Sequence, residues 1–98
     1  MSIQFKTIAE LRSMLDSKAI SSKEIVEETY KLIDGNADLN AFITLNKEAA
    51  IAKSIEIEST SAKSVLHGIP IAQKDLFCTK DLRTTCGSNI LSNFIPPY

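Results

Sequence analysis

The sequence predicts a small α/β protein in which two helices precede a strand, a third helix and a second strand. Two helix-start patterns, Thr7–Glu10 and Ser21–Glu24, are each followed by apolar residues at helical spacing. Two short stretches, residues 41–45 and 69–73, have the length and composition of strands. Together these patterns order the elements along the chain.

The first helix is expected to begin after Thr7. Thr7 and Glu10 have the Thr-x-x-Glu spacing of a capping box, in which the two side chains satisfy free backbone donors reciprocally. Ile8, Leu11 and Leu15 then follow at offsets of three and seven. These offsets place the three side chains on one helical face, which we interpret as core.

The second helix is expected to begin after Ser21. Ser21 and Glu24 repeat the capping-box spacing, and Ile20 and Ile25 have the spacing of a hydrophobic staple. Gly35 should end the helix, since glycine readily adopts the left-handed conformation. Because the connection between the two helices is short, we expect them to pack as a helical hairpin.

The middle of the chain is expected to contain a strand and a third helix. Residues 41–45, Ala-Phe-Ile-Thr-Leu, are typical of a strand. Asn46 can cap a helix that continues to about Ser59. Its predicted apolar face consists of Ile51, Ala52 and Ile55, with Ile57 off that face.

Lys74 ends an uncharged run, residues 69–73, that suits a buried strand. Burial disfavours the charged form of an amine, so a lysine in apolar surroundings can serve as a base. Side chains alternate along a strand, so Asp75 should point away from Lys74 and leave its amine unpaired. On this pattern alone, a surface lysine at a strand end is the favoured interpretation.

Other polar residues have weaker indications of function. His67 precedes a glycine and is interpreted as a loop residue rather than a catalytic base. Thr84, Thr85 and Ser88 could line a pocket together with the backbone amide of Gly87, but a solvated loop is favoured. The residues alone therefore single out no complete catalytic group.

Composition limits the classes of function. A chain of 98 residues is at most one small domain, and a net charge of −1 gives no reason to expect non-specific attraction to nucleic acid or to a membrane. No apolar run approaches the roughly 20 residues of a membrane helix, so a cytoplasmic setting is expected. Cys78 and Cys86 are interpreted as ordinary thiols in preference to a disulfide or a zinc site.

The stretch from Leu66 to Asp75, Leu-His-Gly-Ile-Pro-Ile-Ala-Gln-Lys-Asp, resembles the segment that contains the catalytic lysine of the amidase signature family. The following residues, Leu76–Lys80 and Arg83–Ser88, with Asn93-Phe94 and Pro97-Tyr98, resemble one branch of that family. This branch comprises the A subunits of glutamyl-tRNA(Gln) amidotransferases. The resemblance covers essentially the whole chain.

The resemblance implies a mechanism and partners. Family members hydrolyse amides with a Ser–cis-Ser–Lys triad, in which the position matching Lys74 accepts a proton through the middle serine. In the amidotransferase branch, glutamine is hydrolysed and the ammonia amidates glutamate on mischarged tRNA. The implied partners are the B and C subunits, with tRNA bound through the complex. ATP and Mg belong to the complete complex, and no cofactor is expected in this chain.

Two departures from the family pattern affect the expectations. Asp81 occupies a loop position that is usually glycine, and aspartate tolerates a left-handed conformation better than most residues. With only three glycines, the chain also has no counterpart of the Gly/Ser-rich segment that contains both catalytic serines. We therefore expect residues 1–98 to be a truncated, N-terminal portion of a single amidase domain, lacking most of the mixed sheet and inactive alone.

Two alternatives to this interpretation remain at the level of sequence. The chain could belong to a different amide hydrolase of the same family that acts on a small free amide. It could also be a non-catalytic remnant that binds the other components of the amidotransferase.

Overall fold

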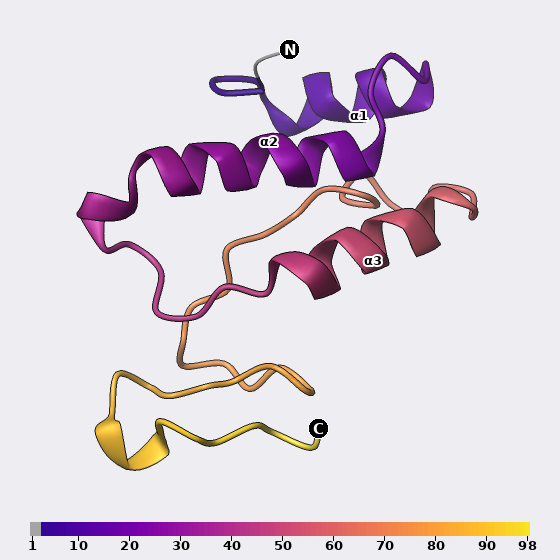
Figure 1. The fold of residues 1–98 in the computed structure, drawn as a ribbon. Helices are drawn as coiled ribbons and strands as arrows, with labels where there is room; N and C mark the ends of the chain where they lie inside the picture. The colour runs from indigo at the N-terminus through magenta and orange to yellow at the C-terminus, as the bar shows by residue number, and fades with distance from the viewer. Residues whose placement is uncertain (1–2) are drawn as a thin grey trace. The chain divides into compact units, whose positions relative to one another are not determined.

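The computed structural model describes residues 3–98, and the chain divides into two compact units. The described part of the first unit comprises residues 3–39 and 47–70, and the second comprises residues 40–46 and 71–98. Figure 1 shows the course of the chain. The elements in order are α1 (Ile8–Asp16), α2 (Ser22–Gly35), the 3-10 helix η1 (Ala37–Leu39), α3 (Lys47–Glu58) and the 3-10 helix η2 (Asn89–Leu91).

The first two helices begin where the sequence predicts. The Thr7 hydroxyl accepts a hydrogen bond from the Glu10 amide at 3.1 Å, and the Ser21 hydroxyl accepts one from the Glu24 amide at 3.1 Å. Each hydroxyl also donates to the carboxylate of its own glutamate at 3.3 Å. The predicted bond between each hydroxyl and the backbone is therefore confirmed, whereas each glutamate carboxylate bonds to the capping hydroxyl instead of a backbone amide.

The C-terminus of α2 differs from the expectation for Gly35. Gly35 is the last helical residue and does not have a positive φ angle. Asn36 satisfies the final carbonyl groups instead: its side-chain amide donates to the Leu32 oxygen at 2.8 Å, and its backbone N–H to the Ile33 oxygen at 3.1 Å. A side-chain donor therefore replaces the left-handed glycine cap.

Within the first unit, α2 packs along α3 rather than along α1. Lys47, at the start of α3, lies over the Tyr30 ring, with 5.9 Å from its Nζ to the ring centroid. Glu58, at the end of α3, accepts a hydrogen bond from the Lys23 amide in the first turn of α2 at 2.9 Å. The two helices are therefore antiparallel, and a carboxylate lies at the positive end of α2. The predicted hairpin of α1 and α2 is replaced by this pair.

The inner face of α3 is not the one predicted. Ser54 is buried and Ile51 and Ile57 are partly buried, whereas Ala52 and Ile55 are exposed. The Ser54 hydroxyl donates to the Ile51 oxygen at 2.6 Å, so its burial leaves no unsatisfied group. Counting aliphatic residues failed here because a hydroxyl that bonds to its own helix can occupy the contact face.

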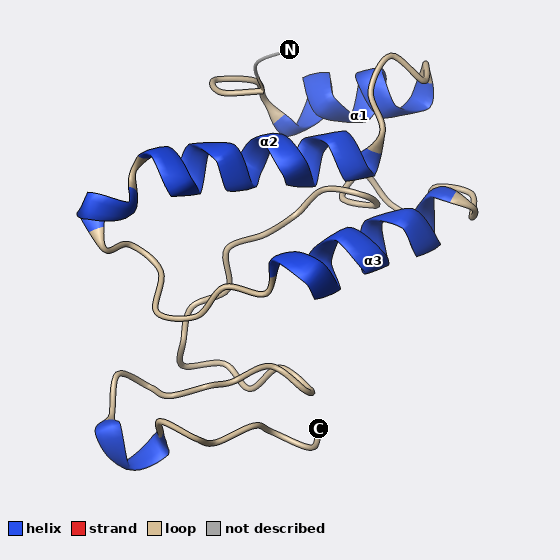
Figure 2. Ribbon diagram, in the orientation of Figure 1, coloured by secondary structure: helices blue, strands red, loops and turns tan. Residues whose placement is uncertain are grey.

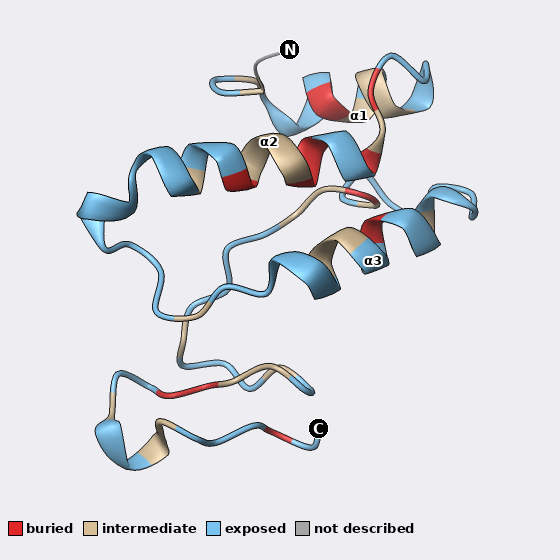
Figure 3. Cartoon of the chain, in the orientation of Figure 1, coloured by how far each residue is buried: buried red, intermediate tan, exposed pale blue. Residues whose placement is uncertain are grey.

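A small apolar cluster joins α1 to the start of α2 (Figure 3). Ile20 and Ile25 are 3% and 1% exposed and pack with Leu11, which confirms the predicted hydrophobic staple. Ile69 packs against the same cluster from the loop that follows α3. The loop is fastened there by the Ser22 hydroxyl, which donates to the Gly68 oxygen at 2.6 Å.

The two predicted strands do not form. Figure 2 shows no regular strand among residues 3–98, and both 41–45 and 69–73 are irregular. Ile71 is 72% exposed, which is incompatible with the expected buried run. A strand is stable only when its backbone groups pair with a neighbouring strand, and the described residues contain no such partner for either segment.

Among residues 3–98, no helix is both long enough and apolar enough to cross a membrane.

We predict that Ile25→Ala lowers the free energy of unfolding by roughly 2–5 kcal/mol, because it removes a fully buried side chain and leaves a cavity. Ile55→Ala is the matched control: the same change at a 52% exposed position of α3 should alter stability by no more than about 0.5 kcal/mol. Urea unfolding followed by helical circular dichroism measures both. Equal losses in the two variants would contradict the assignment of the core.

Candidate functional site

Lys74 lies in the second unit and lines a cavity of about 380 Å³. The cavity is formed by residues 41–44 and by parts of the segment 72–84, including Thr44 and Arg83. Lys74 is exposed, and its amine has no hydrogen bond or ion pair within the described part of the chain. The expectation of apolar surroundings for this amine is therefore wrong for this structure, because the three residues before it, Ile71, Ala72 and Gln73, are themselves exposed.

Asp75 fastens the segment that contains Lys74 to the loop 85–87. One carboxylate oxygen accepts from the Thr85 amide at 2.8 Å, and the other accepts from the Thr85 hydroxyl. The Asp75 backbone oxygen accepts from the Cys86 amide at 2.8 Å. The Gly87 amide in turn donates to the Thr85 hydroxyl at 3.1 Å. We call this group the Asp75–Thr85 clamp.

The clamp explains why Asp75 does not neutralise Lys74. Lys74 and Asp75 form no ion pair, as predicted, but the reason is not strand alternation. The carboxylate is already committed to Thr85. The Thr85 hydroxyl holds the pKa of Asp75 below its ordinary value, helped by the Thr85 and Gly87 amides and by the charge of Arg83, while burial opposes them.

Thr84 and Thr85 are buried, at 3% exposure each, so the interpretation of a solvated loop is wrong for these two residues. Thr84 lines the cavity, and its hydroxyl donates to the Leu82 oxygen at 3.1 Å. The Ser88 hydroxyl accepts from the Ile90 amide at 3.2 Å and caps η2. The three hydroxyls are thus engaged in local structure.

The turn before Arg83 confirms the expectation for Asp81. Asp81 has a φ of +63°, in the left-handed region. Its amide donates to the Pro96 oxygen at 3.0 Å, and the Thr84 amide donates to the Phe94 oxygen at 3.0 Å. These two bonds attach the last residues of the chain to the loop that contains Arg83.

Arg83 was not singled out as a site residue by the sequence. Its Nε donates to the Ser92 oxygen at 2.5 Å and its Nη1 to the Thr44 hydroxyl at 2.8 Å, so it connects three segments around the cavity. A signal was present: Arg83 is the only charged residue between Leu82 and Tyr98. An isolated charge in a stretch of hydroxyl and apolar residues indicates a specific polar contact.

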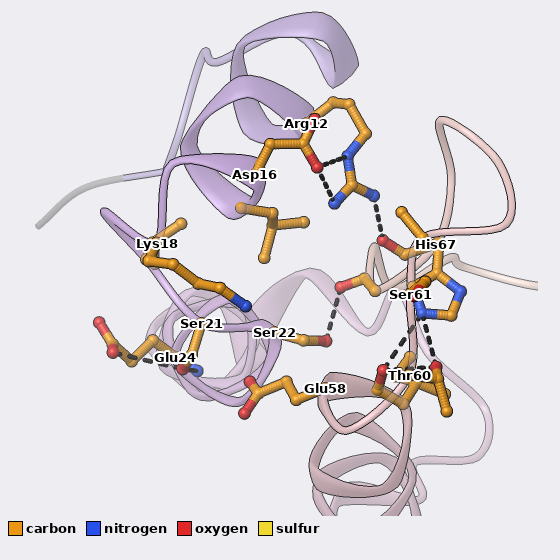
Figure 4. Close-up of a pocket in the computed structure, with 15 residues that line it drawn as sticks. Arg12, Asp16, Lys18, Ser21, Ser22, Glu24, Glu58, Thr60, Ser61 and His67 are labelled. Carbon is orange, nitrogen blue, oxygen red and sulfur yellow. Dashed lines mark hydrogen bonds and ion pairs between the residues drawn. The ribbon is translucent and has the colours of Figure 1, made fainter.

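A second cavity, of about 340 Å³, lies within the first unit (Figure 4). Nε2 of His67 lies 3.2 Å from both the Thr60 hydroxyl and the Ile57 oxygen, and the His67 backbone oxygen accepts from Arg12 at 2.6 Å. Arg12 also pairs with Asp16 at 2.8 Å. These contacts hold the loop in place, which agrees with the interpretation of His67 as a loop residue.

Neither cysteine thiol takes part in the clamp. Cys78 and Cys86 are exposed free thiols. Among residues 3–98, no group of three or more His, Cys, Asp or Glu side chains is arranged to hold a metal ion.

We predict that Thr85→Val raises the pKa of Asp75 toward its ordinary value of 3.8, because the change removes the largest favourable contact to the carboxylate. A lowered pKa stabilises the folded state above pH 3.8, and this stabilisation is lost as the pH falls through the folded-state pKa. The stabilities of wild type and variant should therefore converge in acid. The carbon-13 shift of the Asp75 carboxyl measures the pKa directly.

Thr79→Val is the control for this prediction, since Thr79 lines the same cavity but makes no side-chain bond to Asp75. It should leave the pKa of Asp75 unchanged. An unaltered Asp75 titration in Thr85→Val would refute the role given to the hydroxyl.

Comparison with known proteins places this chain in a family. The sequence model of the Amidase family matches residues 24–98. The A subunit of glutamyl-tRNA(Gln) amidotransferase from Coxiella burnetii is 47% identical over 97 residues, which is 95% of this chain and 20% of that protein. The A subunits from Natranaerobius thermophilus and Nitrosomonas eutropha are 44% and 46% identical, over 100% and 94% of this chain.

The chain spans about one fifth of the length of these curated relatives. No solved structure matches it. The family match includes Lys74 and the whole Asp75–Thr85 clamp, and the chain belongs to the amidase family.

Proposed function

We propose that this chain forms the N-terminal part of the glutamine-hydrolysing A subunit of a glutamyl-tRNA(Gln) amidotransferase, with Lys74 as a catalytic residue. The observation that supports this most is the identity of 44–47% to three such proteins over nearly the whole chain. Lys74, within the family match, lines a cavity and has an unpaired amine. No other lysine among the described residues lines this cavity.

The proposed role of Lys74 is to accept a proton. A lysine amine can do this only in its neutral form, which is favoured when the amine is removed from water. Lys74 is exposed here, so the proposal requires groups outside the described residues to cover it. The same groups include the two serines of the family triad, one to attack the amide carbon and one to pass its proton toward Lys74.

The Asp75–Thr85 clamp supports this role in two ways. It fixes the backbone next to Lys74 through bonds to both carboxylate oxygens and to the Asp75 carbonyl. It also occupies the adjacent carboxylate, which would otherwise be the nearest anion along the chain. An ion pair with Asp75 would favour the protonated amine and oppose proton transfer.

The proposal assigns the remaining chemistry to other components. Ammonia released from glutamine would pass to the B and C subunits, where tRNA is bound and ATP and Mg are used. The complete complex would act in the cytoplasm. Nothing in the proposed role of this chain needs a cofactor of its own. Its contribution is a lysine held on a clamped segment.

We predict that the 98 residues alone release no ammonia from glutamine, because they lack the Gly/Ser-rich segment of the nucleophile. The purified chain is incubated with glutamine, and ammonia is measured with glutamate dehydrogenase. If the wild-type chain hydrolysed glutamine and Lys74→Ala abolished that activity, the nucleophile would lie within these residues. This result would contradict the prediction.

We further predict activity in a chimera. This chain replaces the aligned segment of the Coxiella burnetii protein, which is expressed together with the other components of its complex, and glutaminase activity is measured. Lys74→Ala should reduce kcat by roughly 10²–10⁴-fold, the usual contribution of a general base. Lys74→Arg should be equally inactive, since arginine keeps the charge but does not lose its proton.

Lys80→Ala serves as the control, because Lys80 is an exposed lysine of the same unit that does not line the cavity. It should retain full activity. A Lys74→Ala chimera as active as the unmodified chimera would exclude Lys74 from catalysis.

A further inference from the structure

The Thr85 side chain is buried, and its hydroxyl makes two bonds of opposite direction. The Gly87 amide donates to this hydroxyl at 3.1 Å. The hydroxyl donates its own proton to a carboxylate oxygen of Asp75, and this bond is the main reason that the pKa of Asp75 is below its ordinary value. An ionised carboxylate can only accept, so the direction of the bond is fixed. The single proton of Thr85 is therefore used to hold Asp75.

Lys74 and Asp75 lie in a turn, so strand geometry does not separate their side chains. The Phe77 amide donates to the Lys74 oxygen at 3.1 Å, which closes a turn over residues 74–77. In a regular strand, successive side chains point to opposite faces, and the turn removes that constraint. Lys74 and Asp75 both line the cavity of about 380 Å³. A specific contact is therefore needed to keep the two charges apart.

The charged side chains that line this cavity are Lys74, Asp75 and Arg83, and the segment 41–44 contributes no charge to it. Arg83 is held in place by two hydrogen bonds to other segments. The Lys74 amine, by contrast, is exposed and has no ion pair within the described part of the chain. Lys74 is therefore the cation that is free to move to Asp75 if the carboxylate is released.

We propose that Thr85 is a positioning residue for Lys74, because its hydroxyl holds the Asp75 carboxylate away from the Lys74 amine. An ion pair stabilises the charged form of an amine, and the charged form cannot accept a proton. By preventing this pair, Thr85 leaves the amine able to lose its proton. Thr85 acts through Asp75 and has no contact with substrate in this role. The inference rests on the proposed function for the role of Lys74, whereas the separation of the two charges does not.

The separation is tested by a double-mutant cycle on the pKa of Asp75, read from the carbon-13 shift of its carboxyl in the 98-residue chain. In the unaltered chain, Lys74→Gln should leave the pKa of Asp75 unchanged, because the two side chains form no ion pair. In Thr85→Val, the released carboxylate oxygen pairs with Lys74, so Lys74→Gln should raise the pKa of Asp75 by about half a unit to one unit. Thr85→Ser keeps the hydroxyl and should behave as the unaltered chain does.

The consequence for catalysis is tested through the pH profile of kcat in the chimera with the Coxiella burnetii protein. Thr85→Val should move the acidic limb to higher pH by about half a unit to one unit and lower kcat at neutral pH by roughly three- to tenfold, with KM unchanged. Thr85→Ser should retain the original profile. Ser88→Ala is the matched control: it removes a hydroxyl that accepts a backbone amide in the same unit but makes no bond to Asp75, and it should not move the profile.

Three results would overturn the inference. If Lys74→Gln raises the pKa of Asp75 in the unaltered chain, the carboxylate already pairs with Lys74. This measurement needs a substitution only at an exposed position, so it decides the question even if Thr85→Val does not fold. If Lys74→Gln has no effect on the pKa of Asp75 in Thr85→Val, the hydroxyl does not keep the two charges apart. An acidic limb that stays in place in Thr85→Val, or that moves equally in Ser88→Ala, removes the positioning role.

The two experiments also separate this inference from the proposed function. Coupling of Lys74 to Asp75 that appears only in Thr85→Val, with a chimera whose activity is independent of Lys74, leaves the separation of charges by Thr85 and removes the proposed function. Activity that depends on Lys74, without coupling in Thr85→Val, does the reverse.

Discussion

The hydrogen bonds between Asp75 and Thr85 are the contact on which the second unit depends. They join two segments that the sequence separates by ten residues, and they bury Thr85 without leaving a polar atom unsatisfied. The segment with Lys74 and the loop with Arg83 are both adjacent to this contact. This carboxylate therefore fixes the backbone next to Lys74 and forms no ion pair with its amine.

The helices could be predicted from sequence because their determinants are local. Thr7 and Ser21 each act on an amide three residues away, and the staple of Ile20 and Ile25 spans a single turn. Such patterns do not depend on the rest of the fold. The face of α3 could not be predicted in this way, since it depends on which helix packs against it. Ser54 is inside because α2 is there.

The two strands were predicted wrongly because their determinants are not local. Residues 41–45 and 69–73 have strand composition, but strand formation is a property of a pair. The same distinction applies to the candidate site. Lys74 was found from its position in a segment, whereas Arg83 and the buried state of Thr84 depend on contacts between segments far apart in sequence. Resemblance to a family supplied the proposed chemical role of Lys74, which no periodicity could supply.

The adjacency of Lys74 and Asp75 in sequence would ordinarily suggest charge cancellation. In the folded unit the opposite holds, because three N–H and O–H donors from residues 85–86 meet the aspartate and its carbonyl. A carboxylate with such partners is a poor ligand for a flexible, solvated amine, whose pairing at the surface is worth about 1 kcal/mol or less. The aspartate thus contributes structure, and the Lys74 amine has no ion pair within the described part of the chain.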